Sequence, residues 1–192
     1  MAKRAFDLVV SVVGLIILSP IFLIAALFVK LSGPGPVFFR QVRVGRGFRH
    51  FRIYKFRTMV DGASGPPITV RGDPRVTPVG RFLRRTKLDE LPQLLNVISG
   101  RMSLVGPRPE LPQYVDAFRD DYTEILRVRP GITDEASIAF RDEEELLSRA
   151  SDPQEMYVTE ILPRKIALAR HYARKRTFFG DLGIIARTIF HL

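Results

Sequence analysis

The sequence predicts an α+β, mostly helical protein, with an N-terminal re-entrant membrane helix-break-helix and amphipathic helices surrounding a small β-hairpin. Three observations lead to this prediction. An apolar N-terminal run is interrupted by Ser19-Pro20, cations alternate with aromatic residues on both sides of Gly45-Arg46-Gly47, and apolar residues recur at helical spacing after residue 88. The 192 residues are enough for one compact core. We therefore expect a membrane hairpin at residues 1–31 and a domain at 32–192 that fold as one unit.

The N-terminal run, residues 5–29, carries Asp7 as its one charge. About 20 apolar residues suffice to span a bilayer as a helix. Pro20 lacks an N–H group and would cost roughly 3 kcal/mol inside a straight helix, so we expect a break at Ser19 and Pro20. The two pieces would be about 21 Å and about 14 Å long, and both are shorter than the roughly 30 Å hydrocarbon core of a bilayer.

Basic residues flank this run on both sides, with Lys3 and Arg4 before it and Lys30 and Arg40 after it. Such residues stay on the cytoplasmic side of a membrane. A re-entrant hairpin keeps both flanks inside, whereas a spanning helix would place one of them outside. A kinked spanning helix and a cleaved signal peptide are the alternatives.

Basic residues also outnumber acidic ones over the whole chain, 30 against 20, for a net charge of +10. Residues 1–110 hold 18 basic and 6 acidic residues, so the front half attracts anions. Nucleic acid, an anionic membrane leaflet or a phosphate-rich small substrate would each match that charge. The absence of cysteine excludes disulfides and cysteine nucleophiles, and three scattered histidines argue against a zinc site.

The alternating segment predicts a β-hairpin with arms near residues 37–44 and 48–58. One face would be cationic, and Lys55 and Arg57 are candidates for binding phosphate. A solvated edge and a surface for single-stranded nucleic acid are the alternatives. Residues 61–80 are rich in Gly and Pro, which indicates a surface loop or mobile lid.

Two adjacent carboxylates, Asp89 and Glu90, follow a run of cations. With Asp89 as N-cap, Pro92 falls in the first turn of a helix near 90–98 that Gly100 ends. A helix N-terminus and nearby cations favour ionised carboxylates. An ionised carboxylate can ligate Mg²⁺ or attack phosphorus, although a simple capping role is the alternative for Asp89. The rigid segment from Gly106 to Pro109 would hold the Arg108 guanidinium in a fixed pose suited to phosphate.

The C-terminal part predicts helices broken at Pro163 and near Gly180. The acidic run Asp142 to Glu145 reads as a solvated helix face rather than a second metal site. The last helix carries apolar residues at a helical spacing that most often indicates core packing, with a membrane-interface position as the alternative. These residues are Phe178, Phe179, Leu182, Ile185, Ile189 and Phe190. We expect this helix to pack against the N-terminal hairpin or the lipid surface.

Several segments together resemble the bacterial sugar transferases known as monotopic phosphoglycosyl transferases. They are the Ser19-Pro20 break, PGPVFFRQ, IYKFRTM, RFLRRTKLDELPQLLNV, MSLVGPRPE and RPGIT, in that order over residues 3–135. The resemblance implies a cytoplasmic catalytic domain on the bacterial inner membrane. It implies transfer of a sugar phosphate from a nucleotide diphosphate sugar, with UDP as the expected nucleotide, to polyprenyl (undecaprenyl) phosphate.

The resemblance also implies roles for individual residues. Asp89 would be the nucleophile and the Mg²⁺ ligand, Glu90 would assist catalysis, and Lys55, Arg84 and Arg108 would contact substrate phosphates. Inner-membrane lipids would be partners, nucleic acid would not, and a homodimer is left open. After Thr133 the chain departs from the family pattern with DEASIAFRDEEELL, so the resemblance assigns no residues to the sugar or the base. The alternative function is a non-enzymatic module with a hydrophobic anchor that binds nucleic acid or anionic lipid.

Overall fold

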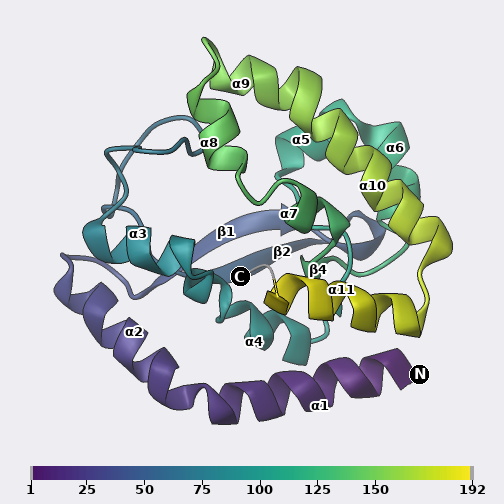
Figure 1. The fold of residues 1–192 in the computed structure, drawn as a ribbon, viewed down its shortest axis with the longest axis horizontal. Coiled ribbons are helices and arrows are strands. Elements are labelled where there is room, and N and C mark those ends of the chain that lie inside the picture. Colours follow the sequence, from purple (N-terminus) through teal and green to yellow (C-terminus); the bar gives the residue numbers. More distant parts are fainter. Residues whose placement is uncertain (1, 191–192) are drawn as a thin grey trace.

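The structure is a computed structural model that describes residues 2–190, and it is mostly helical with two small sheets (Figure 1). The N-terminal half contains α1 (Ala2–Ile17), α2 (Ser19–Leu31), β1 (Phe38–Val44), η1 (Arg46–Phe48), β2 (His50–Phe56), α3 (Pro78–Arg85), η2 (Leu88–Glu90), α4 (Gln93–Ile98) and β3 (Ser103–Val105). The C-terminal half contains α5 (Pro112–Ala117), α6 (Arg119–Ile125), β4 (Gly131–Thr133), α7 (Glu135–Ala139), α8 (Glu143–Ser148), α9 (Pro153–Met156), η3 (Tyr157–Ile161), α10 (Leu162–Lys175) and α11 (Phe178–Phe190).

The α1 and α2 helices form a bent arm along one side of the molecule (Figure 1). The chain bends by 64° at Leu18, directly before Ser19-Pro20. The Ser19 hydroxyl donates to the Ile16 carbonyl at 2.7 Å and so satisfies a carbonyl at the end of α1. Between residues 2 and 190, no single helix is both long and apolar enough to cross a membrane, and α1 and α2 meet that criterion only as a bent pair.

Polar contacts on the inner face of α1 hold the arm to the rest of the chain. Arg4 donates to the carbonyls of Val97 and Ile98, at 2.7 and 3.1 Å, where α4 ends. The buried Asp7 carboxylate accepts from the Ser103 hydroxyl at 2.7 Å. The outer face of the arm is apolar and exposed at Leu8, Val9, Val12, Val13, Ile16, Ile17, Leu23, Ile24, Leu27, Phe28 and Leu31.

The predicted hairpin is present as antiparallel β1 and β2, with Phe38 opposite Phe56 and Val44 opposite His50. Gly47 adopts a φ of 66°, a left-handed conformation that glycine adopts without strain and that lets η1 turn the chain. Phe22 of α2 packs against Phe56, with ring centroids 4.9 Å apart. The hairpin is therefore fixed against α2 of the bent arm.

A second, parallel pair formed by β3 and β4 was not predicted, because each strand has three residues and its partner is distant in sequence. The chain leaves β3 at Gly106 beside Gly131, the first residue of β4. A Cβ atom on Gly131 would lie 2.1 Å from the Gly106 nitrogen. Glycine is therefore required at this crossing, which leads directly into the turn that carries Arg108.

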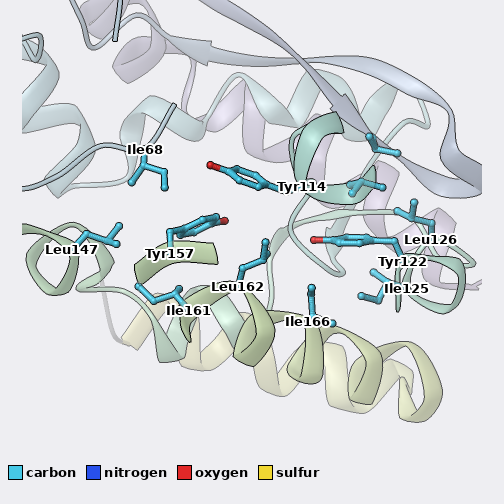
Figure 2. Packing of buried hydrophobic residues seen from close by; sticks show 12 residues of the cluster. Ile68, Tyr114, Tyr122, Ile125, Leu126, Leu147, Tyr157, Ile161, Leu162 and Ile166 are labelled. Carbon is cyan, nitrogen blue, oxygen red and sulfur yellow. The ribbon is translucent and has the colours of Figure 1, made fainter. Parts of the chain in front are cut away.

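The largest buried cluster lies among α5, α6, η3 and α10, and Figure 2 shows Tyr114 and Tyr157 facing one another within it. Their ring centroids are 5.2 Å apart. The predicted break at Pro163 is wrong, because α9, η3 and α10 follow one another without interruption from Pro153 to Lys175. A π-helical turn precedes the proline, and the Leu162 N–H donates to the Tyr157 carbonyl. Such turns shift the hydrogen-bond register by one residue, which accommodates a proline that cannot donate.

The break predicted near Gly180 occurs earlier, at Arg176 and Thr177, and the Thr177 hydroxyl accepts from the Gly180 N–H at 3.0 Å. Phe178 of α11 packs against Phe6 of α1, as expected for packing against the N-terminal hairpin, whereas three other residues of α11 are not packed in a core. Phe179 is 81% exposed, Ile189 62% and Phe190 86%, whereas Leu182 and Ile185 are half-buried. The buried side chains of α11 are Asp181 and Ile184, so the helix turns a large part of its apolar surface outward.

Candidate active site

The segment that carries the two carboxylates differs from the predicted cap. Lys87 has a left-handed backbone with φ 56°, and the chain then forms the short turn η2 before α4 begins at Gln93. The expected N-cap role of Asp89 is therefore wrong, and no side-chain hydrogen bond caps either element. The Thr86 hydroxyl donates to the Phe82 carbonyl at 2.9 Å and so belongs to the end of α3. The expected end of this helix at Gly100 is correct, since Gly100 has a φ of 80°.

Glu90 lies between two cations from distant parts of the chain. Lys55 Nζ on β2 donates to Glu90 Oε1 at 2.8 Å, and Arg108 donates through both terminal nitrogens, with Nη1 3.2 Å from Oε2. Burial alone would raise the pKa of Glu90, but the charges and hydrogen bonds of Arg108 and Lys55 outweigh it and hold the pKa well below its usual range. Glu90 is therefore firmly ionised at neutral pH.

The Asp89 carboxylate, unlike that of Glu90, is not hydrogen-bonded to a cation among the described residues. Asp89 is 6% exposed, and its carboxylate accepts no hydrogen bond from residues 2–190, while Lys55 Nζ lies 4.0 Å from Oδ2. Burial raises the pKa of Asp89 above its ordinary value, despite the opposing charge of Lys55. The expectation that the surroundings favour the ionised form is correct for Glu90 and wrong for Asp89. Asp89 therefore keeps lone pairs that a metal ion or an electrophile can use.

Arg108 is positioned by its backbone as well as by Glu90. Its backbone N–H donates to Asp134 Oδ2 at 3.0 Å, and Asp134 Oδ1 accepts from the Ser137 N–H at 2.7 Å as the N-cap of α7. The charge of Glu90 raises the pKa of Arg108, which stays a cation. Sequence reasoning missed Asp134 as a positioning residue. The sequence pattern that could have identified Asp134 is that of a helix N-cap, an Asp three residues before Ser137 at the start of a short helix.

Arg84 lies next to the carboxylates but contacts other partners. Its Nε donates to the Thr58 hydroxyl at 3.0 Å, and its Nη1 donates to Glu144 at 2.8 Å. The acidic run lies at the surface as predicted, and two of its members form solvent-exposed ion pairs, Glu144 with Arg84 and Glu145 with Arg71 at 2.9 Å. These pairs join α8 to α3 and to the loop before it. The loop ends earlier than predicted, because α3 begins at Pro78.

Arg57 is not brought into this cluster. Its buried guanidinium donates to the Val29 carbonyl at 2.9 Å and to the Gly33 carbonyl at 2.8 Å, where α2 ends. Cations at a helix C-terminus satisfy carbonyls that have no partner in the helix. The structure therefore unites Lys55, Asp89, Glu90 and Arg108, with Arg84 beside them, and directs Arg57 to α2.

A divalent cation fits this cluster in one specific way. Among the described residues, no group of three or more Asp, Glu or His side chains is arranged to hold a metal. Mg²⁺, however, usually keeps several waters and binds through one or two carboxylates plus substrate phosphates. The Asp89 carboxylate, buried and without a hydrogen-bond donor, suits that partial coordination.

Comparison with known proteins identifies the family of this chain. The family model for bacterial sugar transferases matches residues 1–192. The chain is 38% identical over 98% of its length to the UDP-glucose:undecaprenyl-phosphate glucose-1-phosphate transferase of Escherichia coli strain K12, of which it covers 39%. It is 41% identical over 97% of its length to the undecaprenyl-phosphate glucose phosphotransferase of Komagataeibacter xylinus, of which it covers 35%.

A third relative is more nearly equal in length. The chain is 39% identical over 97% of its length to the UDP-glucose:undecaprenyl-phosphate glucose-1-phosphate transferase of Caulobacter vibrioides, of which it covers 68%. The chain thus spans less than half of the first two relatives and about two thirds of this one. The match over its own full length shows that the chain belongs to the bacterial sugar transferase family.

Proposed function

We propose that this chain is a phosphoglycosyl transferase that moves a sugar 1-phosphate from a UDP-sugar to undecaprenyl phosphate, through a phosphosugar bound covalently to Asp89. The observation that carries the proposal is the contrast between the two carboxylates. Glu90 is held by two cations, whereas Asp89 is buried without a hydrogen-bond donor. Relatives that match nearly all of this chain are named as transferases from UDP-glucose to undecaprenyl phosphate.

The reaction consists of two displacements at phosphorus. In the first, an Asp89 carboxylate oxygen bonds to the phosphorus that bears the sugar, and the bond from that phosphorus to the UMP oxygen breaks. In the second, a phosphate oxygen of undecaprenyl phosphate attacks the same phosphorus, and the bond to Asp89 breaks. The carboxylate is regenerated, the lipid diphosphate sugar leaves, and the kinetics are ping-pong.

An anion that attacks a diphosphate needs its own charge and that of the substrate balanced. Lys55 has three donors and Arg108 five, so each retains donors beyond those that Glu90 accepts. Glu90 and Asp134 hold these cations in place before substrate binds, which reduces reorganisation in the transition state. Mg²⁺ held by Asp89 and the diphosphate would neutralise charge on the phosphate oxygens.

The proposed position places the bent arm in the inner leaflet of the bacterial inner membrane, with the rest of the chain on the cytoplasmic face. The exposed apolar face of α1 and α2 supports this position, since such a surface is costly in water. The basic residues at both ends of the arm, Lys3, Arg4 and Lys30, then lie on the cytoplasmic side. The active cluster adjoins this arm, because β2 contacts α2 and α4 contacts α1.

The proposal is tested by intact-mass measurement of detergent-solubilised chain mixed with UDP-glucose or UDP-N-acetylgalactosamine and Mg²⁺, without lipid. We expect a mass gain equal to one sugar phosphate and release of one UMP per chain. Addition of undecaprenyl phosphate should remove the adduct. A binding module without chemistry would give neither adduct nor UMP from any UDP-sugar, with or without lipid, and that result would refute the proposal.

A further inference from the structure

A cavity of about 230 Å³ lies at the N-terminal end of α1. Its lining contains five cations and one carboxylate, namely Lys3, Arg4, Arg46, Arg129, Arg176 and Asp7. None of Lys55, Asp89, Glu90 and Arg108 lines it. The cavity is therefore separate from the active cluster, and its charge favours an anion.

Little of this positive charge is balanced by the protein. Lys3 pairs with Asp181, and the Asp7 carboxylate accepts from Ser103. In the part of the chain that the structure describes, the exposed side chains of Arg46 and Arg176 make no hydrogen bond or ion pair. Two guanidinium groups thus remain available to a ligand.

Arg129 shows that these cations act on one another. Its Nε donates to the Gly100 carbonyl at 3.0 Å, a neutral partner. Burial lowers the pKa of Arg129, and the positive charges of Arg46, Arg4 and Arg176 lower it further. Like charges held this close repel, and an anion between them would relieve that repulsion.

The cavity adjoins apolar surface on two elements. Phe6 lies beside Asp7 on α1 and packs edge-on against Phe178 of α11, with ring centroids 5.4 Å apart. Phe179 is 81% exposed. Aromatic residues next to cations are typical of the boundary between lipid tails and headgroups.

We propose that this cavity binds the phosphate group of an anionic phospholipid of the surrounding bilayer. Guanidinium groups bind phosphate through paired hydrogen bonds, and the cytoplasmic leaflet supplies anionic lipid at this depth. The bound headgroup fixes the N-terminal end of α1 and the start of α11 at the membrane surface. The proposal rests on the membrane position given above, and it does not depend on the chemistry at Asp89.

The test uses the full chain in neutral detergent at constant ionic strength. Thermal unfolding is followed while dihexanoyl phosphatidylglycerol, dihexanoyl phosphatidylcholine, inorganic phosphate or UMP is added. The variant Arg46→Gln/Arg176→Gln removes two cavity cations whose side chains make no hydrogen bond or ion pair with the described residues. Its matched control is Arg127→Gln/Arg164→Gln, which removes the same charge from exposed arginines outside the cavity. No sugar nucleotide is present, so loss of transferase chemistry cannot change the result.

We expect phosphatidylglycerol to raise the thermal unfolding midpoint in a saturable way. Its apparent affinity should be at least about tenfold lower in the cavity variant and unchanged in the control. Phosphatidylcholine should stabilise less, because its headgroup carries no net charge. If inorganic phosphate or UMP binds as tightly as phosphatidylglycerol, the lipid is not the ligand. If both variants lose binding equally, or wild type shows none, the cavity is not a phosphate site.

Discussion

Arg108 and Glu90 form a two-point ion pair, in which both terminal nitrogens of the guanidinium donate to the carboxylate. Lys55 donates to the same carboxylate at 2.8 Å, whereas the adjacent Asp89 receives no hydrogen bond from the described residues. Two neighbouring acids thus differ in their environment: Glu90 accepts hydrogen bonds from two cations, whereas Asp89 accepts none from the described residues.

Replacement of the free carboxylate should abolish transfer. Asp89→Asn keeps the shape of the side chain but removes the charged oxygen, so turnover should fall at least about a thousandfold and no phosphosugar adduct should form. Release of UMP from a UDP-sugar measures this. The control is Asp116→Asn, which removes an exposed acid that pairs with Arg119 at 3.4 Å. Near-normal turnover in Asp89→Asn would exclude the nucleophile role.

The same variant should be more stable than wild type at neutral pH. Because burial raises the folded-state pKa of Asp89, its ionisation costs stability. That cost is absent below the unfolded pKa of about 3.9 and grows as pH rises through the raised folded pKa. The thermal midpoint of Asp89→Asn should therefore exceed that of wild type at pH 7 to 8 and approach it near pH 4. A difference that is constant with pH would contradict the raised pKa.

Replacement of the paired carboxylate should have the opposite effect. Glu90→Gln leaves the half-buried Lys55 and Arg108 beside a neutral group, and we expect a loss of about 3 kcal/mol in unfolding free energy, measured by chemical denaturation. Glu145→Gln breaks solvent-facing pairs with Arg71 and Arg149, and should cost about 1 kcal/mol or less. Equal losses in both variants would show that the Glu90 cluster is not an electrostatic unit.

The stability difference between wild type and Glu90→Gln should also depend on pH. A carboxyl with a depressed folded pKa adds stability that is present above its unfolded pKa, about 4.3, and is lost as pH falls through the folded pKa. The difference between the two proteins should therefore be constant near neutral pH and shrink in acid. A difference that grows in acid would have the wrong sign.

The bend between α1 and α2 should determine the topology of the arm. A straight helix over residues 2–31 would be about 45 Å long, enough to cross a hydrocarbon core of roughly 30 Å. The chain has no cysteine, so Ala2→Cys adds a single label site. Combined with Pro20→Ala, that site should become reactive from outside intact cells in part of the population. With Pro36→Ala or with no second change, it should stay protected, and outside labelling there would exclude the re-entrant arm.

The N-terminal break and the hairpin were predictable because both arise from neighbours in sequence. Proline at position 20 limits helix continuity whatever surrounds it, and alternating residues around Gly45-Arg46-Gly47 specify a hairpin locally. The pair β3 and β4 was not predictable, since three-residue strands carry no detectable period and their pairing depends on the approach of Gly106 to Gly131.

The site residues also differ in how far the sequence predicted their positions. Lys55, Asp89, Glu90 and Arg108 were singled out from residue type and motif, and the structure gathers them within one cluster. Arg57 carries the same charge two residues after Lys55, yet it binds carbonyls at the end of α2. Its direction depends on where a distant helix ends, which no local pattern specifies.

The sequence by itself determined the charge, the break at Pro20 and the family motifs, because these depend on residue identity and short spacing. Only the tertiary structure decided that Glu90 accepts hydrogen bonds from Lys55 and Arg108, whereas Asp89 accepts none from the described residues and has Lys55 4.0 Å away. The charge state of each carboxylate depends on its burial and on the cations near it. These cations come from distant parts of the chain, since Glu90 lies 35 residues from Lys55 on β2 and 18 residues from Arg108.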